Sequence, residues 1–325
     1  MAKRPWLVPA AFILLGLIWG SSFLWIKIGV EEMDPATLVA YRISLGALAM
    51  LAYVRLTGEK LPRTVREWLP MAALGMIATA LPFFLITWGE QYIDSGTAAV
   101  LNSLTPIFSL ILAGLILHTE SVTLIRTIGL VTGFAGAALL ASREFALRGD
   151  PLALIGVAAV TVAAISYAGG ASVSKAMVHG TPRNVVAAGN LTFGAIYIWI
   201  FTLLTGADPS LPTQTDSIIA VLWLGLLGSF LAFVLLYFLI ANLDATVASM
   251  VTYLFPVVGV TLGVVFLNEV LDTQLRGADG KLTLTFEIIY GHALKPVPRA
   301  PMGEQTAVSM DDMRAMLQSE RRGRE

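Results

Sequence analysis

The sequence contains no cysteine among its 325 residues. A disulfide framework, a thiolate metal cluster and a cysteine nucleophile are therefore all excluded. Charged residues are scarce at 13%, whereas hydrophobic residues make up 56%. A soluble globule of this size needs more polar surface than that, so the composition predicts a protein whose surroundings are largely lipid.

An excess of positive charge is missing as well. Lys and Arg number 21 against 22 Asp and Glu, which gives a net charge of −1. Because nucleic-acid-binding proteins neutralise phosphates with basic residues, we expect no nucleic-acid partner. The 3 histidines have no metal-ligand spacing, and no catalytic dyad or phosphate-binding loop is recognisable. We therefore expect no metal, no cofactor and no enzymatic activity.

Long apolar runs fill most of the chain. The first follows Lys3 and Arg4 and is too long for a secretory signal, whose apolar core spans about 7–15 residues. A membrane-spanning helix needs about 20 apolar residues. Nine such spans can be placed, at residues 7–28, 35–55, 69–92, 95–117, 124–142, 151–175, 184–205, 217–241 and 245–268.

Basic residues in the loops predict the orientation of these spans. Arg143 and Arg148 lie on one side, and they share a loop that the predicted topology does not explain. The amino-terminal side carries nine basic residues, namely Lys3, Arg4, Arg55, Lys60, Arg63, Arg66, Arg126, Lys175 and Arg183. Since cytoplasmic loops are enriched in Lys and Arg, we expect a multi-pass protein of the plasma (inner) membrane with a cytoplasmic N-terminus.

The chain also repeats itself with a period of about 150 residues. The stretch Leu81–Pro106 aligns without a gap on Leu231–Pro256. Identical pairs include Phe83 with Phe233, Asp94 with Asp244, and Pro106 with Pro256, each 150 positions apart. Looser matches pair Lys27 with Lys175, Pro35 with Pro182, and Glu120 with Glu269.

The repeat predicts two five-helix units, at residues 1–145 and 150–276, of which the second is truncated to four helices. Five helices in a unit is an odd number, so consecutive units must insert in opposite directions about a pseudo-two-fold axis in the membrane plane. Such an inverted repeat suits alternating access, because each half can take the conformation of the other. The predicted fold class is thus an all-α polytopic membrane protein.

Two sets of motifs carry a resemblance to a known family. The first is Trp19-Gly20-Ser21-Ser22-Phe23 followed by Lys27, Asp34-Pro35 and Arg42, and the second is Leu104-Thr105-Pro106 with Glu120, echoed by Phe255-Pro256 with Glu269. Over residues 5–275 the sequence resembles the EamA family of the drug/metabolite transporter superfamily. The resemblance implies ten helices and a secondary transporter of metabolites or amino acids.

The carboxyl end departs from that family's pattern. After Gln274 no tenth apolar helix follows, so nine spans are expected, together with a short non-membrane tail at residues 279–325. The tail is strand-like from Leu282 to His292, and it has an amphipathic helix that starts at Ser309. It weakly resembles the C-terminus of malonyl-carrier-protein methyltransferases. Because no glycine-rich nucleotide turn lies upstream, we interpret it as the result of a fusion or truncation.

Polar and aromatic residues inside the spans are the candidate site. An ionised side chain in a span costs roughly 2.5–3.5 kcal/mol, so each needs a partner, a wet cavity or an escape to the interface. The substrate-cavity candidates are Trp19, Ser22, Arg42, Trp88, Gln91, Asn102, Tyr167, Asn190, Tyr237 and Tyr253. The gating or coupling candidates are Lys27, Glu90, Pro106, Lys175 and Pro256. Interhelix pairing, snorkelling and simple packing remain alternatives for these residues.

The leading hypothesis is a secondary transporter or exporter of a small metabolite, such as an amino-acid or drug-like solute, that works by alternating access. Its partners would be the solute and the lipid bilayer, with a proton as the candidate coupling ion. The alternative is a non-transporting truncated chimera or a membrane interaction scaffold. Substrate identity, direction and oligomeric state stay open at this point.

Overall fold

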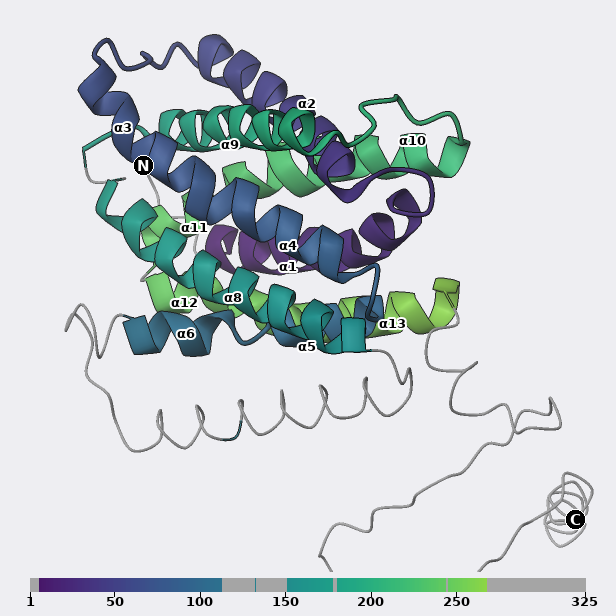
Figure 1. Cartoon of the computed structure of the whole chain (residues 1–325). Coiled ribbons are helices and arrows are strands. Elements are labelled where there is room, and N and C mark those ends of the chain that lie inside the picture. Colours follow the sequence, from purple (N-terminus) through teal and green to yellow (C-terminus); the bar gives the residue numbers. More distant parts are fainter. Residues whose placement is uncertain (1–5, 113–131, 133–150, 178–179, 244, 268–325) are drawn as a thin grey trace, which may run out of the picture. The chain divides into compact units, whose positions relative to one another are not determined.

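The computed structural model describes residues 6–112, 132, 151–177, 180–243 and 245–267. All regular elements in these residues are helical, and they contain no strand (Figure 1). The elements are α1 (Leu7–Gly29), α2 (Pro35–Leu56), α3 (Val65–Gly75), η1 (Met76–Ala80), α4 (Leu81–Gly89), α5 (Ser95–Asn102), α6 (Thr105–Ile111), α8 (Pro151–Met177), α9 (Arg183–Thr205), α10 (Thr215–Leu222), η3 (Trp223–Leu231), α11 (Ala232–Asn242), α12 (Ala245–Ser249), η4 (Met250–Leu254) and α13 (Phe255–Leu267).

Seven helical stretches of the described chain are long and apolar enough to cross a membrane. They are Leu7–Gly29, Pro35–Leu56, Val65–Gly89, Pro151–Ser174, Arg183–Thr205, Thr215–Asn242 and Val247–Leu267, with Ser95–Ile111 as a shorter apolar stretch. Large apolar side chains face outward, among them Leu204 at 82% exposure and Val257 at 67%, as suits contact with lipid. The chain is an all-α polytopic membrane protein, as predicted.

The number of spans stays a prediction. The span predicted at 124–142 and the tail at 279–325 lie outside the described residues. The same holds for the missing tenth helix and for the strand-like segment from Leu282 to His292. The last described helix, α13, extends to Leu267.

Local sequence explains where the helices start and stop. Asp34 Oδ1 accepts a hydrogen bond of 2.8 Å from the backbone N–H of Ala36 at the start of α2, and Pro35 occupies the first turn, where no donor is needed. Gly58, after α2, and Gly206, after α9, both have φ of 71°. Glycine adopts this left-handed conformation without a Cβ clash. The two helices that end alike belong to different halves of the repeat.

The third and eighth spans each contain a π-helical segment. These are η1 (Met76–Ala80) and η3 (Trp223–Leu231), and the position 150 residues after Met76 is Leu226, inside η3. π-Helical turns are rare and are often found at functional sites.

The fourth and ninth spans are broken rather than continuous. Helix α5 ends at Asn102 and α6 begins at Thr105, whereas α12 is followed by the 3₁₀ segment η4 before α13 begins. Pro106 and Pro256 each occupy the second position of the new segment. Proline is tolerated there because the missing N–H has no partner within the first turn. Both prolines therefore start a segment after a break, and their predicted gating role remains a prediction.

Contacts between the helices come in matching pairs, as a two-fold-related repeat would produce. Helices α2 and α9, which are equivalent in the two repeats, pack on each other. The contact of α2 with η3 matches the contact of α9 with η1. Similarly α1 on α13 matches α8 on α5 and α6, and α1 on α11 matches α8 on α4. Figure 1 shows α2 and α9 side by side. The direction of the symmetry axis relative to a membrane stays a prediction.

Glycines permit close helix crossings in these matched contacts. A Cβ added to Gly46 on α2 would lie 2.6 Å from the Cβ of Ser229, and one added to Gly194 on α9 would lie 2.7 Å from the Cγ2 of Thr79. Gly46 and Gly194 are 148 positions apart, and Thr79 and Ser229 are 150 apart. The same close helix crossing thus occurs twice, each time between a helix of one half and a helix of the other.

Matched hydrogen bonds also hold the loops. Thr37 Oγ1, at the start of α2, donates to the carbonyl of Asp208 at 2.7 Å, after the end of α9. Asn184 Nδ2, at the start of α9, donates to Glu59 Oε1 at 2.7 Å, after the end of α2. Helices α2 and α9 are therefore antiparallel, and these two contacts lie at opposite ends of the pair.

Glu32 stabilises the loop that follows α9, at the end of the pair where Thr37 contacts Asp208. Its Oε1 accepts from both the backbone N–H and the Oγ1 of Thr213, each at 2.7 Å, in the segment between α9 and α10. These donors, with further ones from Ser217 and Gln214, lower the pKa of Glu32 to about 2. The carboxylate that ties this loop therefore stays ionised at neutral pH.

Candidate functional site

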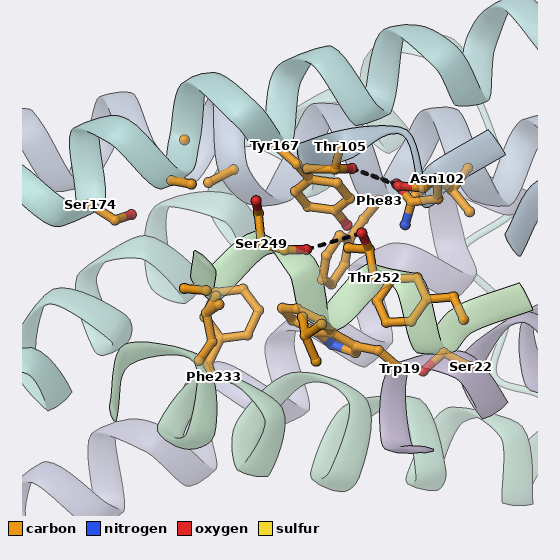
Figure 2. Close-up of a pocket in the computed structure, with 18 of the residues that line it drawn as sticks. Trp19, Ser22, Phe83, Asn102, Thr105, Tyr167, Ser174, Phe233, Ser249 and Thr252 are labelled. Carbon is orange, nitrogen blue, oxygen red and sulfur yellow. Dashed lines mark hydrogen bonds between the residues drawn. The ribbon is translucent and has the colours of Figure 1, made fainter. Parts of the chain in front are cut away.

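A cavity lies among the helices of both halves. Its volume is ≈ 90 Å³ for the centres of water-sized spheres, and since one water needs roughly 10–15 Å³ by this measure, it can hold several waters or a small organic solute. Figure 2 shows Tyr167, Asn102 and Thr105 on one side of it, with Trp19 and Phe233 on the other. Helices α1, α2, α4, α8, α9 and α11 contribute to the lining, together with the broken fourth and ninth spans.

Aromatic rings form much of the wall. Trp19 on α1 meets Phe233 and Phe255 edge to face, with ring centroids 6.3 Å and 6.2 Å apart. Phe83 on α4 meets Phe233 and Tyr167 in the same way, each at 6.2 Å. Such edge-to-face contacts stabilise a defined ring orientation. The wall is therefore preorganised and mostly apolar.

The indole of Trp19 is fixed by the π-helical segment of the opposite half. Its Nε1 donates to the carbonyl of Gly228 in η3 at 2.9 Å. The π-helical turn thus supplies the acceptor that holds a cavity-lining ring in place.

A polar network closes another part of the cavity. Asn190 on α9 accepts a hydrogen bond of 2.7 Å from Thr79 Oγ1, and its Nδ2 donates to Tyr237 Oη at 3.0 Å. Tyr237 Oη also lies 3.3 Å from Ser174 Oγ. All four side chains are buried, so the network satisfies polar groups that would otherwise be costly in this interior.

Arg42 on α2 is the charged residue of the cavity wall. It is 3% exposed, and its Cζ lies 4.3 Å from the centroid of the Phe83 ring. It interacts electrostatically with the buried Glu90. Its Nε is buried and has no hydrogen-bond partner among the described residues. A buried guanidinium with a free donor is chemically suited to an anionic group.

Hydroxyl and amide groups mark the two helix breaks. Thr105 Oγ1 donates to the carbonyl of Asn102 at 2.7 Å, and Thr252 Oγ1 donates to the carbonyl of Ser249 at 3.0 Å. The Oδ1 of Asn102 also lies 3.5 Å from Thr105 Oγ1, as Figure 2 shows. These bonds satisfy carbonyls freed by the breaks, which is the usual condition for irregular backbone within a membrane.

Within the part of the chain that the structure describes, no three His, Asp or Glu side chains gather where they could hold an ion. The candidate chemistry of the site therefore rests on aromatic faces, amide and hydroxyl groups, and one guanidinium.

Comparison with known proteins identifies the family of this chain. The model of the EamA-like transporter family matches residues 7–142 and 154–275. The chain belongs to the EamA family. It is an EamA-type transporter by that membership, and the resemblance found in the sequence is confirmed.

Named relatives of this EamA-type chain are transporters too. It is 27% identical over 269 residues to the uncharacterized transporter YoaV of Bacillus subtilis, covering 82% of this chain and 91% of YoaV. It is 29% identical over 264 residues to the uncharacterized inner membrane transporter YedA of Escherichia coli, covering 81% and 83%. A probable terminal-alkyne amino-acid exporter of Streptantibioticus cattleyicolor is 27% identical, covering 83% and 87%.

A solved crystal structure shares the fold of this EamA-type chain. The TM-score is 0.60 at 20% sequence identity, covering 79% of this chain and 87% of the other. The carboxyl-terminal tail lies beyond the residues that the family model matches, and the comparisons do not show its likeness to methyltransferases.

Most of the predicted cavity residues of this EamA-type transporter do line the cavity. They are Trp19, Ser22, Arg42, Asn102, Tyr167, Asn190 and Tyr237. The other three do not. Trp88 packs on Tyr92 with ring centroids 4.9 Å apart, Gln91 is exposed, and Tyr253 is 49% exposed on the outer side of η4. The functional roles of all ten remain predictions.

Two of the gating and coupling candidates, Lys27 and Glu90, are in direct contact. Lys27 Nζ donates to the carbonyls of Glu90 and Ile93, so it ties α1 to the turn after α4 instead of reaching the headgroups. Glu90 is buried rather than solvated. The side chain of Lys175 lies outside the described part of α8.

Several lining residues were not among the sequence candidates. They include the aromatic and hydroxyl side chains of Phe83, Thr105, Ser174, Phe233, Thr252 and Phe255. The signal that could have found them is the repeat, because Phe83 pairs with Phe233, and Thr105 with Phe255, 150 positions apart. Positions that line an inner surface between two related halves occur twice, once in each half.

Proposed function

We propose that this chain is a secondary transporter that moves a small solute by alternating access of its two repeats. The observation that carries the proposal is the cavity itself, which is lined by repeat-related residues of both halves. Solute sites of inverted-repeat transporters lie at the interface of the repeats, near the middle of the membrane. The transporter names of YoaV and YedA support the same class of function.

The matched contacts at the two ends of α2 and α9 suit such a mechanism. Thr37 with Asp208 holds one end, and Asn184 with Glu59 holds the other. Alternating access requires that one end loosens while the other stays closed. Because the two contacts are related by the repeat, each half can adopt the arrangement of its partner with little change in total bonding.

We place the protein in the inner membrane with its N-terminus in the cytoplasm, on the basis of the basic residues in its loops. In this orientation Glu32 and Thr213 lie on the outer side, and Glu59 and Asn184 lie on the cytoplasmic side. Transport needs no bound cofactor in this proposal. A proton is the candidate coupling ion, with Glu90 as the carboxylate that would carry it.

The test is a transport screen with the full-length protein in liposomes. A mixture of radiolabelled amino acids and small organic acids is loaded on one side, and flux is measured with and without a pH gradient. We expect at least one solute to move faster than in empty liposomes. Ala171→Trp, which fills the cavity, should abolish the flux, whereas Leu204→Trp on the lipid-facing surface should not. Equal flux from both variants would refute transport through this cavity.

A further inference from the structure

Resting on this proposed function, we propose that Arg42 binds a carboxylate of the solute, so that the cavity takes small monocarboxylates with an apolar body and rejects organic cations. Three features of the described cavity lead to this: its charge, the unused donor of Arg42 and the position of Glu90.

The charge of the lining is the first feature. Arg42 is the one ionisable residue with a formal charge at neutral pH among the described residues that line the cavity. The remaining lining is apolar, aromatic or neutral and polar. A cationic solute would meet a positive charge in a space with little water, where repulsion is weakly screened. A solute with a single negative charge is complementary, whereas a doubly charged group would bring an uncompensated charge.

The hydrogen bonds of the cavity show where this negative group would bind. Asn190 lies 148 positions after Arg42, at the equivalent place on α9, the same offset that relates Gly46 to Gly194. Asn190 has both ends of its amide satisfied, by Thr79 and Tyr237. Arg42, by contrast, keeps a buried Nε without a partner among the described residues. Buried donors are nearly always satisfied in a working state, and the guanidinium fork matches a planar carboxylate.

Arg42 belongs to the cavity lining, whereas Glu90 does not. Glu90 interacts electrostatically with Arg42. Phe83 restricts the guanidinium from one direction. At Gly228 an added Cβ would lie 3.4 Å from Arg42 Nη2, so the absence of a side chain there keeps space free beside the donor.

The test compares three probes that share one apolar body: 4-methylpentanoate, 4-methylpentanamide and 4-methylpentylammonium. Binding to the purified full-length protein is followed by tryptophan fluorescence, because Trp19 lines the cavity. We expect the carboxylate to bind about 10- to 100-fold more tightly than the amide, as for one charge-assisted hydrogen-bonded pair. The ammonium probe should not compete.

Variants then assign the effect to one side chain. Arg42→Gln should bring the carboxylate and amide to within about twofold of each other, and Arg42→Lys, which keeps the charge without the fork, should retain part of the preference. The control Arg66→Gln removes an exposed positive charge in the first turn of α3 and should leave the preference intact.

Each outcome decides the proposal. Equal binding of carboxylate and amide to the wild type, or no binding of the carboxylate, refutes the carboxylate site. The liposome screen then decides separately whether the transporter function stands. A preference that survives in Arg42→Gln also overturns the proposal. If Arg42→Gln fails to elute as a folded protein on gel filtration, the wild-type series and Arg42→Lys decide.

Discussion

The matched glycine crossings allow a sharp test of the packing between the two halves. At Gly46 an added Cβ would lie 2.6 Å from Ser229 Cβ, 3.2 Å from the carbonyl of Gly225 and 3.3 Å from the backbone nitrogen of Phe230. Two of these atoms belong to the backbone of η3, and the third is attached directly to it. None is the movable end of a long side chain. Gly46→Ala must therefore push α2 and η3 apart.

The expected cost is that of overpacking a filled interior, about 1–3 kcal/mol. Helix propensity opposes this, because Ala is favoured over Gly by about 1 kcal/mol inside a helix. Gly169→Ala provides the matched control, since an added Cβ at Gly169 on α8 meets nothing within 4 Å. We thus expect Gly46→Ala to be less stable than wild type and Gly169→Ala to be as stable or more so.

The assay is thermal unfolding of the purified protein in one detergent, followed by tryptophan fluorescence. Gly194→Ala, the repeat counterpart, should lower the midpoint to a similar extent as Gly46→Ala, because its Cβ would lie 2.7 Å from Thr79 Cγ2. If Gly46→Ala and Gly169→Ala have the same unfolding midpoint, the close crossing of α2 and η3 is wrong. If Gly46→Ala and Gly194→Ala differ strongly, the two halves are not equivalent in packing.

Three further predictions concern single hydrogen-bonded groups. The pKa of Glu32 is depressed to about 2 from 4.5. Its ionised carboxylate therefore contributes fully to stability above about pH 4.5, and this contribution is lost as pH falls toward 2. Glu32→Gln should flatten that part of the curve of the unfolding midpoint against pH. Asn190→Leu leaves Tyr237 short of a donor and should cost about 1–3 kcal/mol in the same unfolding assay, more than Asn190→Asp costs at low pH. Trp19→Phe keeps a ring but loses the bond to Gly228, so it should reduce transport while costing only about 0.5–1.5 kcal/mol of stability; unchanged flux would show that the ring orientation does not matter.

Helix positions were largely predictable from the sequence, because lipid imposes a simple rule of length and hydrophobicity. Asp34-Pro35 correctly marks the start of α2, and the apolar runs mark the spans. Interruptions were harder to see. The π-helical segments have no strong local signal, since they depend on packing against other helices, whereas Pro106 marks the break before Thr105.

The face of each helix was the least predictable feature. A span that is apolar all round has no polar periodicity that separates the lipid side from the inner side. Trp88 illustrates this: it follows Phe83 by five residues, and at about 100° per residue it points roughly 140° away from it. Phe83 lines the cavity and Trp88 does not. Gln91 lies beyond the end of α4, where the helical spacing no longer applies.

The repeat supplies the missing information about faces, because a position that is inner in one half is inner in the other. Phe83 with Phe233 and Thr105 with Phe255 follow this rule. Arg42 and Asn190 also line the cavity at equivalent positions, but one side chain is a cationic guanidinium and the other a neutral amide. The scaffold is therefore symmetric where helices cross and asymmetric where polar groups meet the cavity. A symmetric scaffold lets the two halves exchange conformations. The lining is asymmetric, because the guanidinium on α2 faces the same cavity as the amide on α9 and the phenol on α11. Such a lining can distinguish the two ends of a solute.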